Sequence, residues 1–198
     1  MKAVSGSRAS FEPALLAQLG RFRHGVFVKH LKWDLPMVSA NDEFEWDEFD
    51  RADAVYVVLR SRDGDVRACA RLLATTAPYL MHKLLPDAQP EAPDPRVWEL
   101  SRVAVAQRAA LEAAEATEAG DGRDAMQTLL VAVIEAARAR GISRLIGVAA
   151  PAMMRLYRKK GFRLVPEGKT FVLAGESLMR FSLYVFDGRG AERARLAV

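Results

Sequence analysis

The stretch VWELSRVAV, residues 97–105, has the composition of a buried β-strand that is interrupted by three polar residues, Glu99, Ser101 and Arg102. Charged side chains within a buried strand cost free energy unless they are paired or take part in chemistry. Side-chain alternation places Glu99 and Ser101 on one face of the strand and Arg102 on the other, unless a bulge intervenes. The stretch therefore predicts a central strand that carries a polar site.

The segments on either side predict an α/β domain built on one mixed β-sheet that is flanked by helices. A helical period runs over residues 12–32, and an acidic loop that contains Pro36 follows over 33–53. Strands are expected at 54–61 and 65–76, joined by the hairpin turn RDGD, and at 143–150, 162–165 and 181–187. Helices are expected at 78–85, 123–140 and 151–161, and residues 107–122 fit either a helix or a loop.

The length of 198 residues predicts a single domain over 1–198. Within it we expect a helix and acidic loop over 1–53, a sheet core over 54–186 and a flexible tail over 187–198. One cysteine, Cys69, fits a reducing cytoplasm, and the sequence contains neither a signal peptide nor an apolar run long enough to span a membrane. We therefore expect a soluble, cytoplasmic protein.

The net charge of +4 is unevenly distributed along the chain. Residues 41–53 contain seven acidic side chains and one basic one, whereas residues 138–163 contain eight basic side chains and no acidic one. Two solvated faces would account for this pattern, and so would a basic surface that docks an acidic partner. Nucleic acid is a possible partner by charge alone, but the basic stretch has no zinc-ligand spacing, RNP motif or helix-turn-helix signal.

The order of elements resembles the acyltransferase fold that also contains the N-acetyltransferases (a GNAT-like fold). Acetyl-CoA enzymes of that fold follow the central strand with a glycine-containing loop that holds the pyrophosphate. Here Val105 is followed by AQRAALEAAEA, which lacks the glycines that allow close approach of the backbone to phosphate. A CoA-dependent N-acetyltransferase is therefore an alternative, and this loop disfavours it.

Four spaced motifs occur together: R-x3-F-x5-W at 23–33, E-x-D-x2-D at 45–50, R-L-L-x-T-T at 71–76 and W-E-L-S-R at 98–102. In this order and spacing they resemble the acyl-homoserine-lactone synthases, the LuxI-type autoinducer synthases of quorum sensing. The resemblance runs from Arg21 to Val105 and more loosely to Phe186. Ala74 departs from it, because members commonly carry proline there.

The resemblance implies an enzyme that uses S-adenosylmethionine (SAM) and an acyl group from acyl carrier protein or acyl-CoA. The methionine amine attacks the acyl thioester, and the methionine carboxylate then displaces methylthioadenosine (MTA) and closes the lactone. SAM is a substrate, so no cofactor and no metal are implied. Acyl carrier protein is the expected partner, with neither nucleic acid nor a membrane.

Such chemistry needs a base for the amine and a group that stabilises the oxyanion. Glu99 is the only strand carboxylate placed to act as base, although it could instead pair with a core arginine. Ser101 would face the same cleft, and backbone amides near Ser101 or Val103 would stabilise the oxyanion. Arg102 completes the expected catalytic set.

Two arginines and two aspartates are expected to form a salt-bridge cluster that folds the acidic loop over the SAM site: Arg71, Arg102, Asp47 and Asp50. Whether the aspartates touch SAM or only hold the loop stays open at this point.

The first motif is expected to contribute three further side chains to the SAM site. Arg23 would clamp the methionine carboxylate. Phe27 and Trp33 would attract the sulfonium and stack on the adenine, or they would only pack the helix.

Two further sets follow from the resemblance. An apolar tunnel for the acyl chain would be lined by residues that equally fit an ordinary core: Met126, Leu130, Ile146, Gly147, Val148, Met153 and Leu156. Gly147 has no hydroxyl, which favours acyl chains without a 3-oxo group. Basic residues would dock the acidic carrier protein: Arg138, Arg144, Arg155, Arg158, Lys159 and Lys160.

Overall fold

The computed structural model describes residues 1–198 except 36–37, 86–91, 107–124, 174 and 187–198. The chain forms two compact units. Unit 1 comprises Met1–Leu73 and Ser101–Val133, and unit 2 comprises Ala74–Leu100 and Ile134–Val198. Strand β4, Val97–Val105, belongs to both, because it passes from unit 2 into unit 1 between Leu100 and Ser101.

The strands are hydrogen-bonded in the order β1-β2-β3-β4-β5-β7-β6. Strands β4 and β5 pair in parallel. Four other pairs are antiparallel: β1–β2, β2–β3, β5–β7 and β6–β7. The predicted α/β fold on one mixed sheet is therefore confirmed. The proposed boundaries at residues 53 and 186 stay a prediction.

Unit 1 is built on β1 (Lys2–Ser7), β2 (Val55–Arg60) and β3 (Val66–Ala74). The predicted hairpin of β2 and β3 is confirmed, and its turn places Gly64 at a φ of 92°, a value that glycine adopts without strain. Sequence reasoning did not find β1, since the segment KAVSGS has no alternation of apolar and polar residues. Its register is set by pairing with the buried strand β2.

The helix predicted over 12–32 is present in two parts. A short η1 turn (Arg8–Ser10) leads into α1 (Pro13–Arg23), and a π-helical segment, η2 (His24–His30), continues it. A π-helical segment turns less per residue than an α-helix and is frequent at functional sites. Here it carries the buried Phe27.

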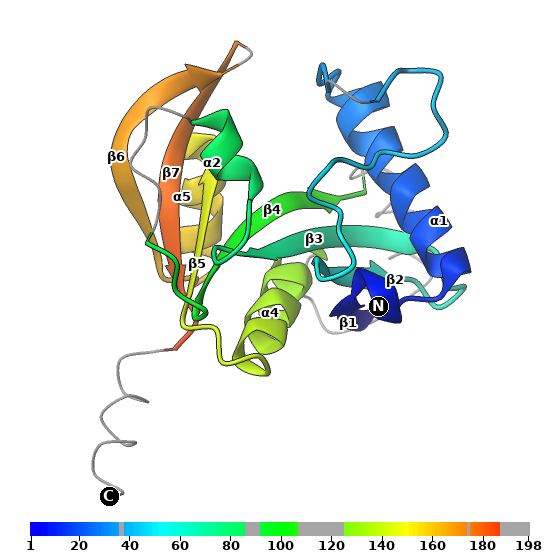
Figure 1. Ribbon diagram of the computed structural model, residues 1–198, viewed down its shortest axis with the longest axis horizontal. Coiled ribbons are helices and arrows are strands. Elements are labelled where there is room, and N and C mark those ends of the chain that lie inside the picture. The colour runs from blue at the N-terminus through cyan, green and yellow to red at the C-terminus, as the bar shows by residue number, and fades with distance from the viewer. Residues whose placement is uncertain (36–37, 86–91, 107–124, 174, 187–198) are drawn as a thin grey trace, which may run out of the picture. The chain divides into compact units, whose positions relative to one another are not determined.

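Unit 2 contains α2 (Leu80–Leu84), β5 (Arg144–Ala149), α5 (Pro151–Lys159), β6 (Leu164–Leu173) and β7 (Glu176–Tyr184). Figure 1 shows β5, β7 and β6 side by side, and α5 packs against β6 and β7. Helix α4 (Ala125–Arg138) begins in unit 1 and ends in unit 2, where Gly141 at a φ of 70° follows its last turn.

Several expectations concern residues beyond the described part of the chain. Both the helix-or-loop segment 107–122 and the tail 187–198 lie outside the described residues, as does Pro36. No helix among the described residues is both long and apolar enough to cross a bilayer.

Candidate active site

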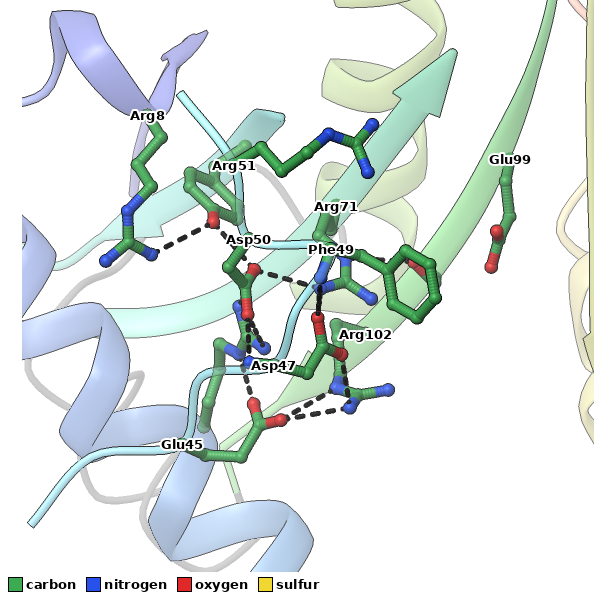
Figure 2. Close-up of polar contacts among 12 residues, drawn as sticks. Arg8, Glu45, Asp47, Phe49, Asp50, Arg51, Arg71, Glu99 and Arg102 are labelled. Carbon is green, nitrogen blue, oxygen red and sulfur yellow. Dashed lines mark hydrogen bonds and ion pairs between the residues drawn. The ribbon is translucent and has the colours of Figure 1, made fainter. Parts of the chain in front are cut away.

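Six charged side chains of unit 1 meet in what we call the charge cluster. Arg23 comes from the end of α1, Arg71 from β3 and Arg102 from β4, while the three carboxylates come from the acidic segment, residues 41–53. Each arginine bridges two carboxylates and each carboxylate bridges two arginines (Figure 2). The closed ring runs in the order Arg23, Glu45, Arg102, Asp47, Arg71 and Asp50.

Arg23 forms a bidentate ion pair with Asp50 in the ring. Its Nη1 and Nη2 donate to the two oxygens of Asp50 at 2.8 and 2.9 Å, and its Nε donates to Glu45. Burial alone lowers the pKa of the guanidinium, but the charges of Asp50 and Glu45 outweigh burial and raise the pKa of Arg23 above its ordinary value. Bidentate pairs of this kind are stronger and more specific in geometry than single contacts.

Arg71 and Arg102 close the other side of the ring. Arg71 Nη1 donates to Asp47 at 2.6 Å and to Asp50 at 2.9 Å. Arg102 donates to Glu45 at 3.0 Å and to Asp47 at 2.8 Å. Burial raises the pKa of Asp50, but the Arg23 and Arg71 charges exceed this effect and hold that pKa well below its usual range. Asp50 therefore stays ionised in the ring at neutral pH.

The predicted salt-bridge cluster of Arg71, Arg102, Asp47 and Asp50 is confirmed, and the structure enlarges it by Arg23 and Glu45. With three charges of each sign the cluster stays neutral, as a buried group of charges must.

Arg23 was expected to clamp a substrate carboxylate. Its side chain is 1% exposed, and all three of its nitrogens already donate to Glu45 and Asp50. This arrangement favours a role in holding the acidic segment. The contact of Arg23 with substrate stays a prediction without support from the geometry.

The structure brings Ser101 and Arg102 into one hydrogen-bonded network, although alternation predicted opposite faces of the strand unless a bulge intervened. Ser101 Oγ accepts a hydrogen bond from Arg71 Nε at 3.2 Å, while Arg102 contacts Asp47, which is itself bonded to Arg71. The physical reason is the backbone of Arg102, whose φ of 50° lies in the left-handed region and breaks the alternation of the strand. The buried thiol of Cys69 donates to the carbonyl of this residue at 3.4 Å.

Phe27 and Trp33 lie together beside the charge cluster. Their rings stack with centroids 4.8 Å apart and planes at 22°, and the Arg102 guanidinium lies 5.5 Å from the Phe27 centroid and 6.0 Å from that of Trp33. Phe27 is buried, whereas Trp33 is 41% exposed. An exposed aromatic face is suited to stack on a base and to attract a cation.

A second layer of side chains supports the ring and was not found from the sequence. The Tyr56 hydroxyl donates to Asp50 at 2.7 Å, and the guanidinium groups of Arg8 and Arg23 lie over the Trp46 ring, 4.1 and 4.9 Å from its centroid. Burial and the charge of Asp50 raise the pKa of Tyr56 above its ordinary value. The available signal was the position of Tyr56 directly opposite Arg71 in the hairpin.

Glu99 belongs to the unit 2 half of β4 and is 2% exposed. Its Oε2 accepts a hydrogen bond from the backbone N–H of Met81 in α2 at 3.2 Å. Burial and this backbone hydrogen bond hold the carboxylate in a fixed orientation. Its role as base, and that of the amides near Val103 in stabilising an oxyanion, stay predictions.

The residues expected to line the acyl chain are distributed over both units. In unit 1, Met126 and Leu130 of α4 are buried, and in unit 2 Ile146 and Gly147 of β5 are buried. Three others are half-buried: Val148, Met153 and Leu156. Their role as a tunnel stays a prediction.

Gly147 is closely surrounded. A Cβ atom at this position would lie 2.7 Å from the Leu100 carbonyl oxygen and 2.8 Å from the ring of Phe181. Phe181 is its cross-strand neighbour on β7 and is 3% exposed. The absence of a side chain at residue 147 is thus required by packing, and Phe181 is a lining candidate that sequence reasoning missed.

The basic residues predicted to dock a partner lie in unit 2. Arg155, Arg158 and Lys159 are exposed on α5, and Lys160 is half-buried after it. Arg158 Nε also donates to the Leu164 carbonyl at 2.9 Å, and two residues outside α5 have intramolecular contacts. Arg138 donates to the Val185 carbonyl, and Arg144 donates to Ser182 and lies 3.7 Å from Glu167. The set therefore places three exposed basic residues on α5, and Arg138 at the end of α4 is exposed as well.

Comparison with known proteins identifies the family of this chain. The sequence pattern of the family described as "Autoinducer synthase" matches residues 8–180. A curated relative from Ralstonia solanacearum, named acyl-homoserine-lactone synthase, is 40% identical over 82% of this chain and 78% of its own length.

Solved structures of autoinducer synthases have the same fold as this chain. The structure of TofI in a ternary complex with an inhibitor and MTA has a TM-score of 0.76 and 31% identity, and it covers 93% of this chain and 92% of that chain. The CoA-dependent acyl-homoserine lactone synthase BjaI, with SAM and isopentyl-CoA, has a TM-score of 0.73 at 24% identity over 99% and 88% of the two chains.

The acyltransferase fold is confirmed by a more distant neighbour. A candidate N-acetyltransferase from Lactobacillus plantarum has a TM-score of 0.58 at 21% identity, over 93% of this chain and 98% of that chain. This likeness concerns the fold alone.

Proposed function

This chain belongs to the autoinducer synthase family and is an acyl-homoserine-lactone synthase, and we propose that it acylates the amine of SAM and then closes the lactone with release of MTA. The observation that supports this sequence of steps most directly is the charge cluster. The cluster is built from residues of all four motifs, and the exposed ring of Trp33 lies beside its member Arg102.

We assign the SAM site to unit 1. TofI has been solved with MTA and BjaI with SAM, and SAM carries a sulfonium and an adenine. The stacked pair of Phe27 and Trp33 offers a face to both groups, since aromatic rings attract cations and stack on bases. Asp47 is 17% exposed, more than the other two carboxylates of the cluster, and we assign it the substrate ammonium.

In the acyl transfer, the nitrogen of SAM attacks the thioester carbonyl carbon, and the nitrogen–carbon bond forms as the thiol leaves. We assign Glu99 to accept the proton that the amine loses, directly or through a water. Its burial and its hydrogen bond from Met81 support this role, because they hold the carboxylate in one orientation.

In the lactonisation, a carboxylate oxygen of the acylated methionine attacks its own γ-carbon. The bond between that carbon and the sulfonium sulfur breaks, and the electron pair stays with sulfur in MTA. No proton transfer is needed in this step. The protein's task is therefore to orient the chain, which makes a rigid, preorganised site more useful than a further base.

Acyl carrier protein is the donor that we propose. The exposed basic residues of α5, Arg155, Arg158 and Lys159, would match its acidic surface. Acyl-CoA is the other donor class, and BjaI is a CoA-dependent enzyme. The sequence after Val105 has no glycine-containing pyrophosphate loop, which supports the carrier protein. A cytoplasmic location stays a prediction.

Gly147 and Phe181 support an unsubstituted or 3-hydroxy acyl chain. A threonine at residue 147 would place its Cβ against the Leu100 carbonyl, so this packing offers no hydroxyl at that position to bond a 3-oxo group. Chain lengths of roughly six to ten carbons are expected from the family resemblance, and the apolar volume of the pocket would set the limit.

The test is an assay of the purified protein with SAM and a panel of acyl donors. We expect MTA and an acyl-homoserine lactone in equal amounts, detected by mass spectrometry, with acyl carrier proteins preferred over the matching acyl-CoA. Glu99→Gln removes the proposed base and keeps the size of the side chain. It should lower kcat and leave the KM for SAM nearly unchanged. Absence of MTA with every donor would overturn the proposed reaction, and a preference for acyl-CoA would overturn the choice of donor.

A further inference from the structure

One buried donor of the charge cluster has no hydrogen-bond partner among the described residues. Arg71 is fully buried, with its Nε bonded to Ser101 and its Nη1 bonded to Asp47 and Asp50. Its Nη2 is shielded from solvent and has no hydrogen-bond partner among the described residues. A buried, unsatisfied donor is costly, and one on a charged group is more costly than one on a neutral group. Such an atom indicates a missing acceptor.

The neighbouring hydroxyl also has a donor to offer. Ser101 Oγ accepts from Arg71 Nε at 3.2 Å, which leaves its own O–H to donate, and within the described residues no acceptor for that hydrogen is recorded. Nε and Nη2 are on the same edge of a guanidinium, so the Ser101 hydroxyl and Nη2 lie close to each other. Ser101 is half-buried, whereas Arg71 Nη2 behind it is shielded from solvent.

We propose that Arg71 Nη2 and the Ser101 hydroxyl bind the α-carboxylate of SAM. This inference rests on the proposed function and gives the substrate carboxylate a partner in place of Arg23. Two donors that converge beside a guanidinium edge suit the two oxygens of a carboxylate. Asp47 lies on the other side of Arg71 and takes the ammonium, so the amino-acid head of SAM would be bound as a zwitterion.

Charge supports a zwitterion over a simple anion. The charge cluster is neutral as it stands, so an added carboxylate alone would leave it with an uncompensated negative charge. An amino-acid head brings one charge of each sign and preserves the balance. The site should therefore discriminate against SAM analogues that lack either charge.

The test compares two ligands in the absence of an acyl donor: SAM and decarboxylated SAM, which lacks only the carboxylate. Dissociation constants are measured by calorimetry for the wild type, Ser101→Ala, Ser101→Thr and Ser61→Ala. Ser61 is a buried serine of the same unit outside the site and serves as the matched control.

We expect Ser101→Ala to weaken SAM by about ten- to a hundredfold, because a hydrogen bond to a charged group is lost. The same substitution should change the affinity for decarboxylated SAM by less than about threefold. Ser101→Thr keeps the hydroxyl and should restore most of the loss, and Ser61→Ala should leave both constants unchanged. Arg71→Lys keeps the charge but lacks Nη2, and it should discriminate between the ligands as Ser101→Ala does.

Three results would overturn the inference. Equal weakening of both ligands would mean that Ser101 only holds Arg71 in place. Unchanged constants together with a lower kcat would move Ser101 to the acyl group, and unchanged constants with unchanged kcat would remove it from the site. Each of these is distinguishable from failure of the proposed function, because that failure would be seen in the wild type as absent SAM binding or absent MTA.

Discussion

The charge cluster of unit 1 and a polar cluster of unit 2 contain the same types of side chain in different surroundings. The polar cluster consists of Arg144, Glu167, Arg180 and Ser182 on neighbouring strands. Its charged side chains are 25–29% exposed, and its ion pairs span 3.7 and 3.8 Å. The side chains of the charge cluster are 0–17% exposed, and they are joined by direct hydrogen bonds.

The difference shows what burial does to an ion pair. In the polar cluster, solvent screens the charges, and the side chains can separate at little cost. In the charge cluster no water replaces a lost partner, so each residue depends on two others. We therefore expect the polar cluster to tolerate substitution, whereas the charge cluster should lose stability when any one member is replaced.

The largest effect should come from removal of one member of the ring. Arg23→Leu leaves Asp50 and Glu45 each short of a buried partner, so we expect the free energy of unfolding to fall by about 3–5 kcal/mol. Arg144→Leu is the matched control in unit 2 and should cost less than about 1 kcal/mol. Urea unfolding of both variants measures the difference, and equal costs would mean that burial does not distinguish the clusters.

A smaller effect is expected at the exposed residues of α5. The double variant Arg155→Glu and Lys159→Glu should raise the KM for acyl carrier protein about tenfold, because opposite charges at a rim steer association. The KM for SAM should not change. Salt at about 0.5 M should remove most of the difference between variant and wild type, since it screens exposed charges.

The control for this variant changes charge elsewhere by the same amount. Lys2→Glu with Lys169→Glu reverses two exposed lysines outside α5 and should leave the KM for carrier protein unaltered. If both double variants raise KM equally, net charge rather than a docking surface governs the encounter.

Local signals in the sequence were sufficient for most elements of the fold. Strand β4 has its predicted bounds, 97–105, because an apolar run between polar connections specifies a buried strand. The pairing of Arg71, Arg102, Asp47 and Asp50 followed from the cost of leaving buried charges unpaired. These two inferences need only composition and charge balance.

Other features depend on contacts that no local pattern reports. The left-handed backbone at Arg102 breaks the alternation of β4, and nothing in the residue type predicts it. The helical period of apolar residues continues past Arg23 and gives no sign that Arg23 is buried. Its burial depends on the contacts with Glu45 and Asp50, which are distant in the sequence. Balancing three arginines of the motifs against their three carboxylates, rather than two against two, was the signal that could have found the full ring.

The smallest predicted effect concerns Tyr56, which supports the ring from outside. Tyr56→Phe removes the hydrogen bond to Asp50 and should lower the free energy of unfolding at pH 7 by about 1 kcal/mol. Burial and the charge of Asp50 raise the pKa of Tyr56 in the folded protein above its unfolded value of about 10. The stability that the neutral hydroxyl contributes is therefore fully present below pH 10 and is lost as the pH rises above it.

This sign makes the variant informative at alkaline pH. Above pH 10 the wild type loses up to about 1.4 kcal/mol per pH unit through Tyr56, whereas the variant has no such group to ionise. The difference between the two should vanish near pH 11, as measured by urea unfolding at pH 7, 9, 10.5 and 11. Tyr184→Phe is the control, because that side chain is 39% exposed and lies outside the ring. A difference between wild type and Tyr56→Phe that stays constant over this range would mean that the hydroxyl is not held against a charged Asp50.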